Sequence, residues 1–254
     1  MHKVLLGFVA LILVIQLFAQ GKITVAVAAN MQYTIEALKE EFNKTVKTKI
    51  DIVLGSSGNL TQQIMQGAPF DIFVSADTSF PQRLADNSFT AAPPEVYAQG
   101  LLVLWSTNVN IELNANLKFL LKNSIRHIAI ANTRTAPYGA AAEYLLKKYG
   151  LYDNVKDKLV TGESITQATQ YIVTKAVDVG FTAKSIVISN EMRGKGKWVE
   201  LNRNDYPPIK QAAALLKFSE HNNTTAAKKF YQFLFSEKAK EFYKKFGYII
   251  PHHD

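Results

Sequence analysis

Short apolar runs alternate with helix-like stretches along the chain from residue 22 onward. Runs rich in Val, Ile and Ala are typical of buried strands, whereas apolar residues that recur every three or four positions are typical of amphipathic helices. We predict strands at residues 22–29, 49–55, 70–76, 95–105, 125–132, 177–183 and 209–219. We predict helices at residues 31–46, 58–66, 79–87, about 116–123, 138–149, 165–176, 223–236 and 237–247. This alternation indicates parallel strands joined by helical crossovers, and hence an α/β fold.

The predicted elements form two α/β series with two long strand-like segments between them. The chain would cross from one series to the other near residues 97–105 and again near residues 204–214, where the prolines of "NDYPPIK" break regular structure. We therefore predict two Rossmann-like α/β lobes joined by a hinge of two crossings. Lobe 1 comprises residues 20–100 plus 209–254, and lobe 2 comprises residues 101–208. A ligand of such a protein lies in the cleft between the lobes.

The first 19 residues differ from the rest of the chain. His2 and Lys3 precede an apolar run over residues 4–15, and Ala19 precedes a polar segment. A basic start, a short apolar core and a small residue before the cleavage point are typical of a secretory signal peptide. The apolar run is shorter than the roughly 20 residues that a membrane-spanning helix needs. We therefore predict a signal peptide at residues 1–19 and export to the periplasm.

The chain has no cysteine and a formal net charge of +8. The absence of cysteine excludes disulfides, cysteine-ligated zinc and a lipid-modified cysteine at the cleavage site. A basic balance is typical of proteins that bind nucleic acids, anionic surfaces or small anions. Export argues against a nucleic-acid partner. Many of the lysines lie on helix-like stretches such as residues 237–247, where a solvated helix face explains them.

Four predicted helices begin with small or polar residues directly after a strand or a short loop. These residues are Asn30 at the first start, Ser57 at the second, Tyr138 in the Pro-Tyr-Gly turn of the third, and Ser164 with Ile165 at the fourth. Each alone could be an ordinary helix cap, which contributes about 1 kcal/mol. Together, two starts in each lobe, they indicate an anion site, because the first turn of a helix has free N–H groups and a positive dipole end. Open α/β sheets bind their ligands at such strand-to-helix junctions.

No charged side chain occupies the positions Asn30, Ser57, Tyr138 and Ile165. A fully ionised oxyanion can be held by hydrogen-bond donors alone, whereas a protonated oxyanion also needs an acceptor for its proton. The site therefore disfavours hydrogen phosphate. Glu163 lies nearby in the sequence, and we expect its carboxylate to face solvent at a helix start.

Four stretches of the sequence resemble the periplasmic molybdate-binding proteins of ABC uptake systems, over essentially the whole chain after the signal peptide. They are "GKITVAVAAN", "GSSGNLTQQIMQGAPFDIFVSAD", "PYG" before a helix, and "FYKKFGYIIP". The resemblance implies a type II periplasmic binding protein, a monomer without a cofactor, that holds molybdate or tungstate between its lobes. It also implies delivery of the anion to the membrane permease of an ABC transporter. The ligand-binding residues that it implies are Asn30 with the amide of Ala29, Ser57, and the amides of Tyr138 and Ile165.

The chain departs from this family's pattern at two positions. Many members have Ser where this chain has Asn30, although an Asn amide can still donate a hydrogen bond. Many members also offer a tyrosine hydroxyl just after the "VDVGF" strand, where this chain has Thr182. We retain Thr182 and Ser164 as weaker candidate ligands. The Tyr138 hydroxyl is the alternative replacement for the missing tyrosine.

Two other functions compete with molybdate or tungstate binding. The same neutral donors would satisfy sulfate, and only the size of the cavity would discriminate between the anions. A secreted hydrolase would use Ser57 as its nucleophile, but "GSSGN" does not match G-x-S-x-G and such a serine needs a histidine base. His127 lies in a strand pattern, His221 lies in a loop, and the final residues 252–254 are typical of a frayed tail. We therefore predict a binding protein and not an enzyme.

Overall fold

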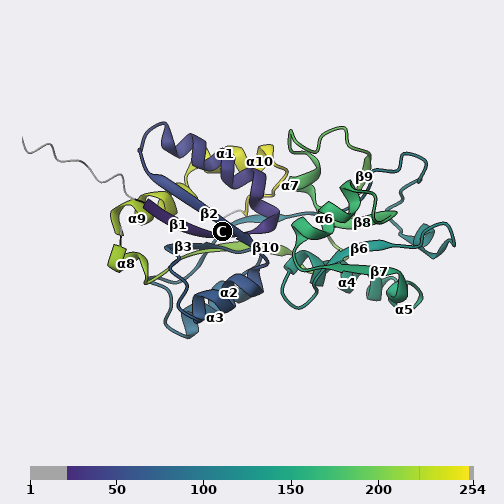
Figure 1. The fold of residues 1–254 in the computed structure, drawn as a ribbon, viewed down its shortest axis with the longest axis horizontal. Helices are drawn as coiled ribbons and strands as arrows, with labels where there is room; N and C mark the ends of the chain where they lie inside the picture. The colour runs from purple at the N-terminus through teal and green to yellow at the C-terminus, as the bar shows by residue number, and fades with distance from the viewer. Residues whose placement is uncertain (1–21, 223, 252–254) are drawn as a thin grey trace, which may run out of the picture.

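Two five-stranded mixed β-sheets form the frame of the protein (Figure 1). The computed structural model describes residues 22–222 and 224–251, so the predicted signal peptide at residues 1–19 lies outside the described residues. The first sheet has the order β2 (Lys49–Gly55), β1 (Lys22–Ala28), β3 (Ile72–Val74), β10 (Ile209–Leu215) and β4 (Glu95–Gly100). The second has the order β7 (Leu159–Gly162), β6 (Ile128–Ala131), β8 (Val179–Ala183), β5 (Leu102–Ser106) and β9 (Lys197–Glu200). Within the described ranges, no helix combines the length and apolar character needed to cross a membrane.

In each sheet four strands run in one direction and one strand runs against them: β10 in the first sheet and β5 in the second. β1 pairs in parallel with β2 and β3, and β6 pairs in parallel with β7 and β8. β10 runs antiparallel to β3 and β4, and β5 runs antiparallel to β8 and β9. The carboxyl ends of the parallel strands in both sheets therefore carry the strand-to-helix junctions at which a ligand would bind.

Helices cover both faces of the first sheet (Figure 1). The upper group in that view contains α1 (Gln32–Asn43) and α10 (Glu237–Lys245), and the lower group contains α2 (Ser57–Met65) and α3 (Ser79–Asp86). The remaining helical elements of this lobe are η1 (Ala29–Met31), α8 (Ser219–Asn222) and α9 (Thr224–Phe233). The apolar stripe of α1 is buried, and it shares a core with Val25 and Val27 of β1, whereas Ala26 belongs to the core that contains Leu60 of α2. Successive residues of this central strand thus serve two cores, because side chains alternate between the faces of a sheet.

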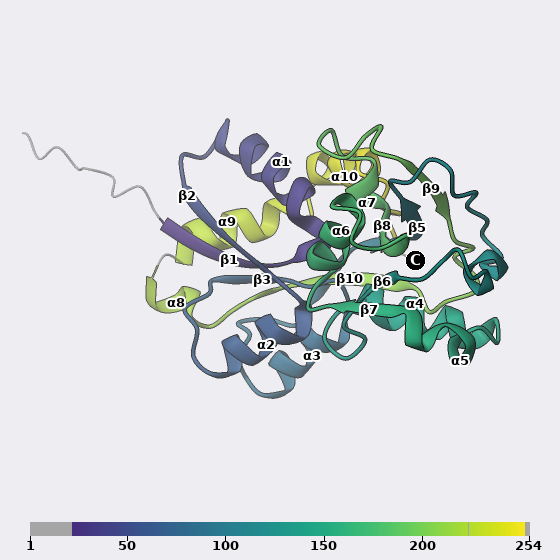
Figure 2. The ribbon, with the colours of Figure 1, turned by 45° about the vertical axis from the view of Figure 1, so that its right-hand side comes forward.

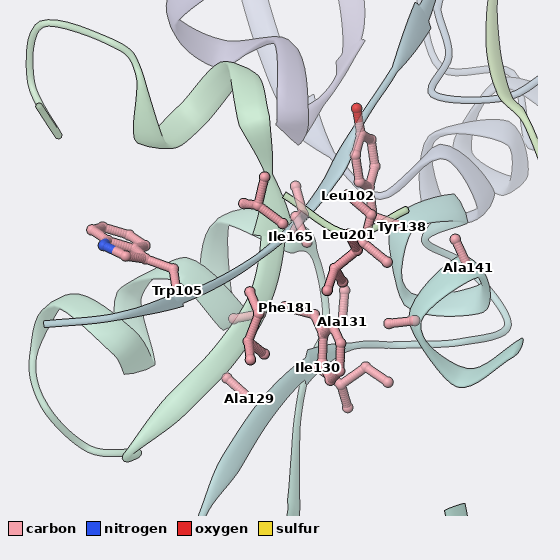
Figure 3. Packing of buried hydrophobic residues seen from close by; sticks show 14 of the residues in the cluster. Leu102, Trp105, Ala129, Ile130, Ala131, Tyr138, Ala141, Ile165, Phe181 and Leu201 are labelled. Carbon is pink, nitrogen blue, oxygen red and sulfur yellow. The ribbon is translucent and has the colours of Figure 1, made fainter. Parts of the chain in front are cut away.

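The second sheet packs its own core against α4 (Pro137–Lys148) and α6 (Ile165–Val173). Figure 3 shows Ile130 of β6 and Phe181 of β8 in this core, together with Ala141 of α4 and Ile165 of α6. Each of these four side chains is buried. The shorter helical elements of this lobe are η2 (Lys118–Leu121), α5 (Tyr152–Val155), η3 (Lys156–Lys158) and α7 (Lys184–Val187). The expected architecture of two α/β lobes is confirmed.

The prediction of one long strand at residues 95–105 is wrong. β4 ends at Gly100 and pairs with β10, whereas β5 begins at Leu102 and pairs with β8 and β9 of the other sheet. The chain therefore passes between the lobes at Leu101, whose carbonyl oxygen accepts a hydrogen bond from the Lys184 amide at 2.9 Å. It returns between β9 and β10. The predicted limits of the two lobes, residues 20–100 plus 209–254 and residues 101–208, stay a prediction as the boundaries of separately folded units.

The apolar pattern misses β7 and β9, which form the two edges of the second sheet. Three of the four residues of β9 are exposed, and only Gly162 of β7 is buried, so neither strand has an apolar run. The predicted helix at residues 165–176 ends at Val173, because Lys175 adopts a left-handed φ of 61°. The helix predicted near residues 116–123 is the short 3₁₀ turn η2.

Asp71 is a buried carboxylate that joins the start of β3 to β1. Its side chain is 1% exposed, its Oδ2 accepts a hydrogen bond from the Thr24 amide at 2.7 Å, and its Oδ1 has no partner. Burial raises the pKa of the Asp71 carboxyl, and the Thr24 N–H offsets part of that shift.

We expect the free energy of unfolding of the Asp71→Asn variant to increase relative to that of the wild type as the pH rises. Because the folded-state pKa of Asp71 is raised, the stabilisation from its bound proton is fully present below about pH 4 and is lost as the pH rises through the folded pKa. The Asn variant has no such titration, and all other groups are common to both proteins. Free energies of unfolding measured at about pH 4 and about pH 7 check this. A difference between the two proteins that stays constant over this range would contradict it.

Candidate functional site

A small cavity lies between the two lobes, where several strands end and helices begin. It has about 200 Å³ of empty space, part of which is open to solvent. That space suits one small occupant. The residues that line it are Ala28, Ala29, Asn30, Gly55, Ser56, Ser57, Ala76, Ala136, Pro137, Tyr138 and Ile165. They come from five junctions: those after β1, β2 and β3 in lobe 1, and the starts of α4 and α6 in lobe 2.

The structure brings together all five residues that the sequence predicts as main ligands. Asn30, Ser57, Tyr138, Ile165 and Ala29 line the same cavity, and each is buried. Figure 2 shows α6 beside the end of β1, although the two are far apart in the sequence. The first turns of α2, α4 and α6 meet at the cavity, so their backbone N–H groups and positive dipole ends converge there. That these residues bind an anion stays a prediction.

Ser57 and its neighbours supply hydroxyl and amide groups from lobe 1. The Ser57 Oγ accepts a hydrogen bond from the Ala76 amide at 3.0 Å, which leaves the hydroxyl hydrogen for a ligand. Ser56 occupies the N-cap position of α2, but its side chain makes no capping bond, and its buried Oγ has no partner. A buried hydroxyl without a partner is costly, so the cavity is where we expect it to find one.

The sequence reasoning missed Ser56 and Ala76. The doublet of serines in "GSSGN" was the signal for Ser56, since both hydroxyls lie next to the same helix start. Ala76 follows β3 as Ala29 follows β1, so its position after a buried strand was the available signal.

Asn30 is almost fully enclosed by polar groups of both lobes. Its side chain is 1% exposed, and its Nδ2 donates to the Gln211 Oε1 at 3.0 Å and to the Tyr248 hydroxyl at 3.2 Å. Its Oδ1 has no partner. Its backbone carbonyl accepts from the Ser185 hydroxyl of lobe 2 at 2.9 Å. Asn30 therefore lies where the cavity, the first sheet and the opposite lobe meet.

The two weaker candidates do not line the cavity. The Thr182 Oγ1 lies 2.7 Å from the Thr169 Oγ1, in a buried pair between β8 and α6. Ser164 caps α6, and its hydroxyl accepts from the Gln167 amide at 3.3 Å. The Tyr138 hydroxyl accepts from the Gln211 Nε2 at 3.0 Å. Thr182 is therefore outside the cavity lining in this arrangement, and its role as a ligand stays a prediction.

Direct contacts between the lobes close the cavity. The Gly58 amide donates to the Thr135 carbonyl at 2.9 Å, and the Asn59 Nδ2 donates to the Glu163 Oε1 at 2.8 Å. Glu163 is exposed, as expected, and it also forms this bridge to the other lobe. On the far side of the cavity, the Thr166 hydroxyl of α6 lies 3.3 Å from the carbonyl oxygen of Ala29. The described structure is thus a closed arrangement of the two lobes.

No residue that lines the cavity carries a formal charge. Burial raises the pKa of the Tyr138 phenol well above its usual value, so this side chain is neutral at physiological pH. His127 and His221 are exposed and lie outside the cavity lining, so within the described ranges Ser57 has no histidine base beside it. Among the described residues, no group of three His, Asp or Glu side chains could hold a metal ion.

Comparison with known proteins identifies relatives over almost the whole described chain. A family model described as bacterial extracellular solute-binding protein matches residues 23–249. The molybdate-binding protein ModA of Rhodobacter capsulatus is 38% identical over 233 residues, which cover 91% of this chain and 89% of the relative. ModA of Azotobacter vinelandii is 37% identical over 229 residues, with 90% of each chain covered. The solved periplasmic molybdate-binding protein of Azotobacter vinelandii aligns with a TM-score of 0.85 and 33% identity, covering 91% of this chain and all of that chain.

We expect Ser57→Ala and Asn30→Ala each to weaken oxyanion binding by about 1 to 3 kcal/mol, because each change leaves a desolvated anion oxygen without a donor. Isothermal titration calorimetry with molybdate measures the effect. Ser236→Ala is the matched control, since it removes the capping hydroxyl of α10, a helix start outside the cavity lining. This control should lose about 1 kcal/mol of stability and no affinity. If the two site variants fold and bind like the wild type, these residues are helix caps only.

Proposed function

We propose, on the premise that the chain belongs to the bacterial extracellular solute-binding proteins, that it captures molybdate or tungstate in the periplasm for an ABC importer. The observation that carries this proposal is the interlobe cavity lined by neutral donors from both lobes. The relatives support it, since the two ModA proteins are named for molybdate binding. Export through a signal peptide at residues 1–19, a monomeric state and the absence of a cofactor belong to the same proposal.

The donor set of the cavity favours a tetrahedral dianion. Backbone amides at three helix starts and the hydroxyls of Ser56 and Ser57 can all donate to anion oxygens. A dianion leaves its hydration shell only if donors from the protein replace the water. Convergent helix dipoles supply a positive potential without a Lys or Arg side chain, so no counter-charge needs to be buried beside the ligand.

Sulfate is the second candidate, since it presents the same charge and the same tetrahedral shape. The smaller sulfate ion would reach fewer donors at once in a cavity fitted to molybdate. The hydrolase alternative is weaker, because neither described histidine lies beside Ser57 and the relatives are solute-binding proteins. The proposed role is therefore capture and delivery without chemical change.

Delivery depends on a difference between the filled and the empty protein. An anion that contacts both lobes binds the closed arrangement better than the open one, so it shifts the population toward closure. A membrane permease can then recognise the closed form. The crossings at Leu101 and between β9 and β10 are the segments about which the lobes would move.

We expect molybdate and tungstate to bind at least about tenfold more tightly than sulfate, which corresponds to about 1.4 kcal/mol. Competition calorimetry of the mature protein, with sulfate displaced by molybdate, measures this ratio. Ferric iron and an amino acid serve as negative controls. Tight binding of either control, with no heat from molybdate or tungstate, would refute the proposal.

We expect molybdate to reduce the radius of gyration of the wild type, and Gly58→Ala to prevent much of this reduction. A Cβ at residue 58 would lie 2.9 Å from the Thr135 Cα of the opposite lobe, too close for the closed arrangement. The variant should therefore bind molybdate at least about tenfold more weakly, a loss of about 1.4 kcal/mol or more.

Small-angle scattering with and without molybdate measures both effects. Gln62→Ala is the matched control, because it changes an exposed residue of the same helix. Without ligand the Gly58 variant should unfold no more readily than the wild type, since Ala favours a helix over Gly. A wild type that binds molybdate without shrinking would rule out ligand-driven closure.

A further inference from the structure

A buried polar network lies behind the cavity and is centred on Gln211 of β10. The Gln211 side chain is fully buried. Its Oε1 accepts from the Asn30 Nδ2 at 3.0 Å and from the Tyr97 hydroxyl at 2.8 Å. Its Nε2 donates to the Tyr138 hydroxyl of the opposite lobe at 3.0 Å. The Gln211 carboxamide thus connects Asn30 of lobe 1 with Tyr138 of lobe 2, and both of these residues line the cavity.

The sheet is locally irregular in a way that builds this network. Gln211 is paired with Ala98 and Ala212 with Val96, so Tyr97 is an extra residue in β4. Such a bulge turns a side chain away from its regular position. Gly100 leaves the space for the network, because a Cβ there would overlap both the Tyr138 hydroxyl and the Gln211 Nε2.

One atom of the network, the Asn30 Oδ1, has no hydrogen-bond partner among the described residues, and Asn30 lines the cavity. With the Asn30 Nδ2 directed at Gln211, the Asn30 Oδ1 is buried and unpartnered. Because Asn30 lines the cavity, an Oδ1 acceptor turned toward it would oppose a ligand whose oxygens are themselves only acceptors. A proton-free anion needs the Asn30 Nδ2, because this nitrogen can donate a hydrogen bond to an anion oxygen.

The Asn30 Nδ2 can face the cavity if the donors and acceptors of the network exchange roles. If both carboxamides turn over, the Gln211 Nε2 donates to the Asn30 Oδ1, and the Tyr138 hydroxyl donates to the Gln211 Oε1. The second hydrogen on Nε2 then meets the Tyr97 oxygen, and the Tyr97 hydroxyl donates to the Ser75 carbonyl, 3.1 Å away. The Tyr248 hydroxyl, which now accepts from the Asn30 Nδ2 at 3.2 Å, then donates to the Asn30 Oδ1 in place of the Asn30 carbonyl. Each side-chain contact of the network then keeps one donor and one acceptor, because the oxygen and nitrogen ends of a carboxamide have nearly the same shape.

The titratable groups that face Gln211 are neutral phenols and so keep their donor hydrogens. Burial raises the pKa of Tyr97 and Tyr138 well above the usual value, with the Asp77 carboxylate adding to the effect on Tyr97. Tyr248, which contacts Asn30, has its pKa raised by burial to about 12. A phenol can donate or accept, which is what a reversible chain of hydrogen bonds requires.

We propose that Gln211 is a specificity-determining positioning residue, which sets the end of the Asn30 amide that faces the ligand. This inference rests on the proposed function. A proton-free oxyanion takes the reversed network with the Asn30 Nδ2 toward the cavity, whereas a proton-bearing oxyanion takes the arrangement with Oδ1 toward the cavity. The ability of Gln211 to donate to the Asn30 Oδ1 is then what favours molybdate over hydrogen phosphate.

Gln211→Glu tests this inference, because an ionised carboxylate only accepts hydrogen bonds. It would hold the Asn30 Nδ2 and leave Oδ1 toward the ligand. At mildly alkaline pH, molybdate and hydrogen phosphate are both dianions and only the second carries a proton, so repulsion by the new charge affects the two alike. We expect the ratio of molybdate to hydrogen phosphate affinity, measured by calorimetry, to fall at least about tenfold in the variant.

Tyr243→Phe is the matched control. It removes a buried tyrosine hydroxyl of the same lobe that donates to the Leu234 carbonyl at 2.8 Å, outside the network. This variant should lose stability and keep the wild-type affinity ratio. An unchanged ratio in Gln211→Glu, with molybdate still bound, would overturn the inference. A wild type that binds no oxyanion would instead refute the proposed function.

Neutron diffraction from a deuterium-exchanged wild-type crystal with molybdate tests the inference even if Gln211→Glu fails to fold. Deuterium distinguishes the nitrogen end of each carboxamide from its oxygen end. We expect the Asn30 Nδ2 at the anion and the Gln211 Nε2 at the Asn30 Oδ1. An Asn30 Nδ2 that still faces Gln211 in the filled site would overturn the inference.

Discussion

The proposed oxyanion ligand can be enclosed by the protein only if hydrogen-bond donors replace its water, and this requirement accounts for the arrangement of the molecule. A buried ion without such donors is too costly to hold, and a buried Lys or Arg would bring a desolvation cost of its own. Helix starts avoid that cost, because their N–H groups are already unpaired and point along the helix axis. The two sheets supply several such starts at one place because their parallel strands end there.

The division into two lobes follows from the same requirement. One lobe alone surrounds at most half of a small ligand, so an enclosed site needs a partner surface that can move away to admit the solute. The interlobe bonds at Gly58, Asn59 and Ser185 show how that surface fits in the closed state. Each of these three bonds is a single hydrogen bond, which suits a contact that would form and break in the proposed cycle of uptake.

The sequence predicted the lobe architecture and the cavity lining well, for identifiable reasons. The apolar runs of β1 and β6 and the stripe of α1 report burial directly. Edge strands such as β9 bury too little to leave a pattern, and the break at Leu101 is preceded only by Gln99 and Gly100, too weak a signal to divide the strand-like segment. Which of several hydroxyls faces the cavity depends on tertiary contacts, as the pairing of Thr182 with Thr169 illustrates. Gln211 was visible as the one polar residue in the buried run "QAAALL", but nothing in the sequence indicated its partners.

Because Gly100 has no side chain, residues of the polar network can pack directly against the crossing between the lobes. Gly100 ends β4 beside the crossing, and the Tyr138 and Gln211 side chains occupy the space that its Cβ would fill. The segment about which the lobes would move in the proposed mechanism thus also borders the polar network. A lineage that acquired a bulkier residue here would change its opening equilibrium and its solute preference in one step. Divergence toward another anion would therefore begin at the hinge as readily as in the cavity wall.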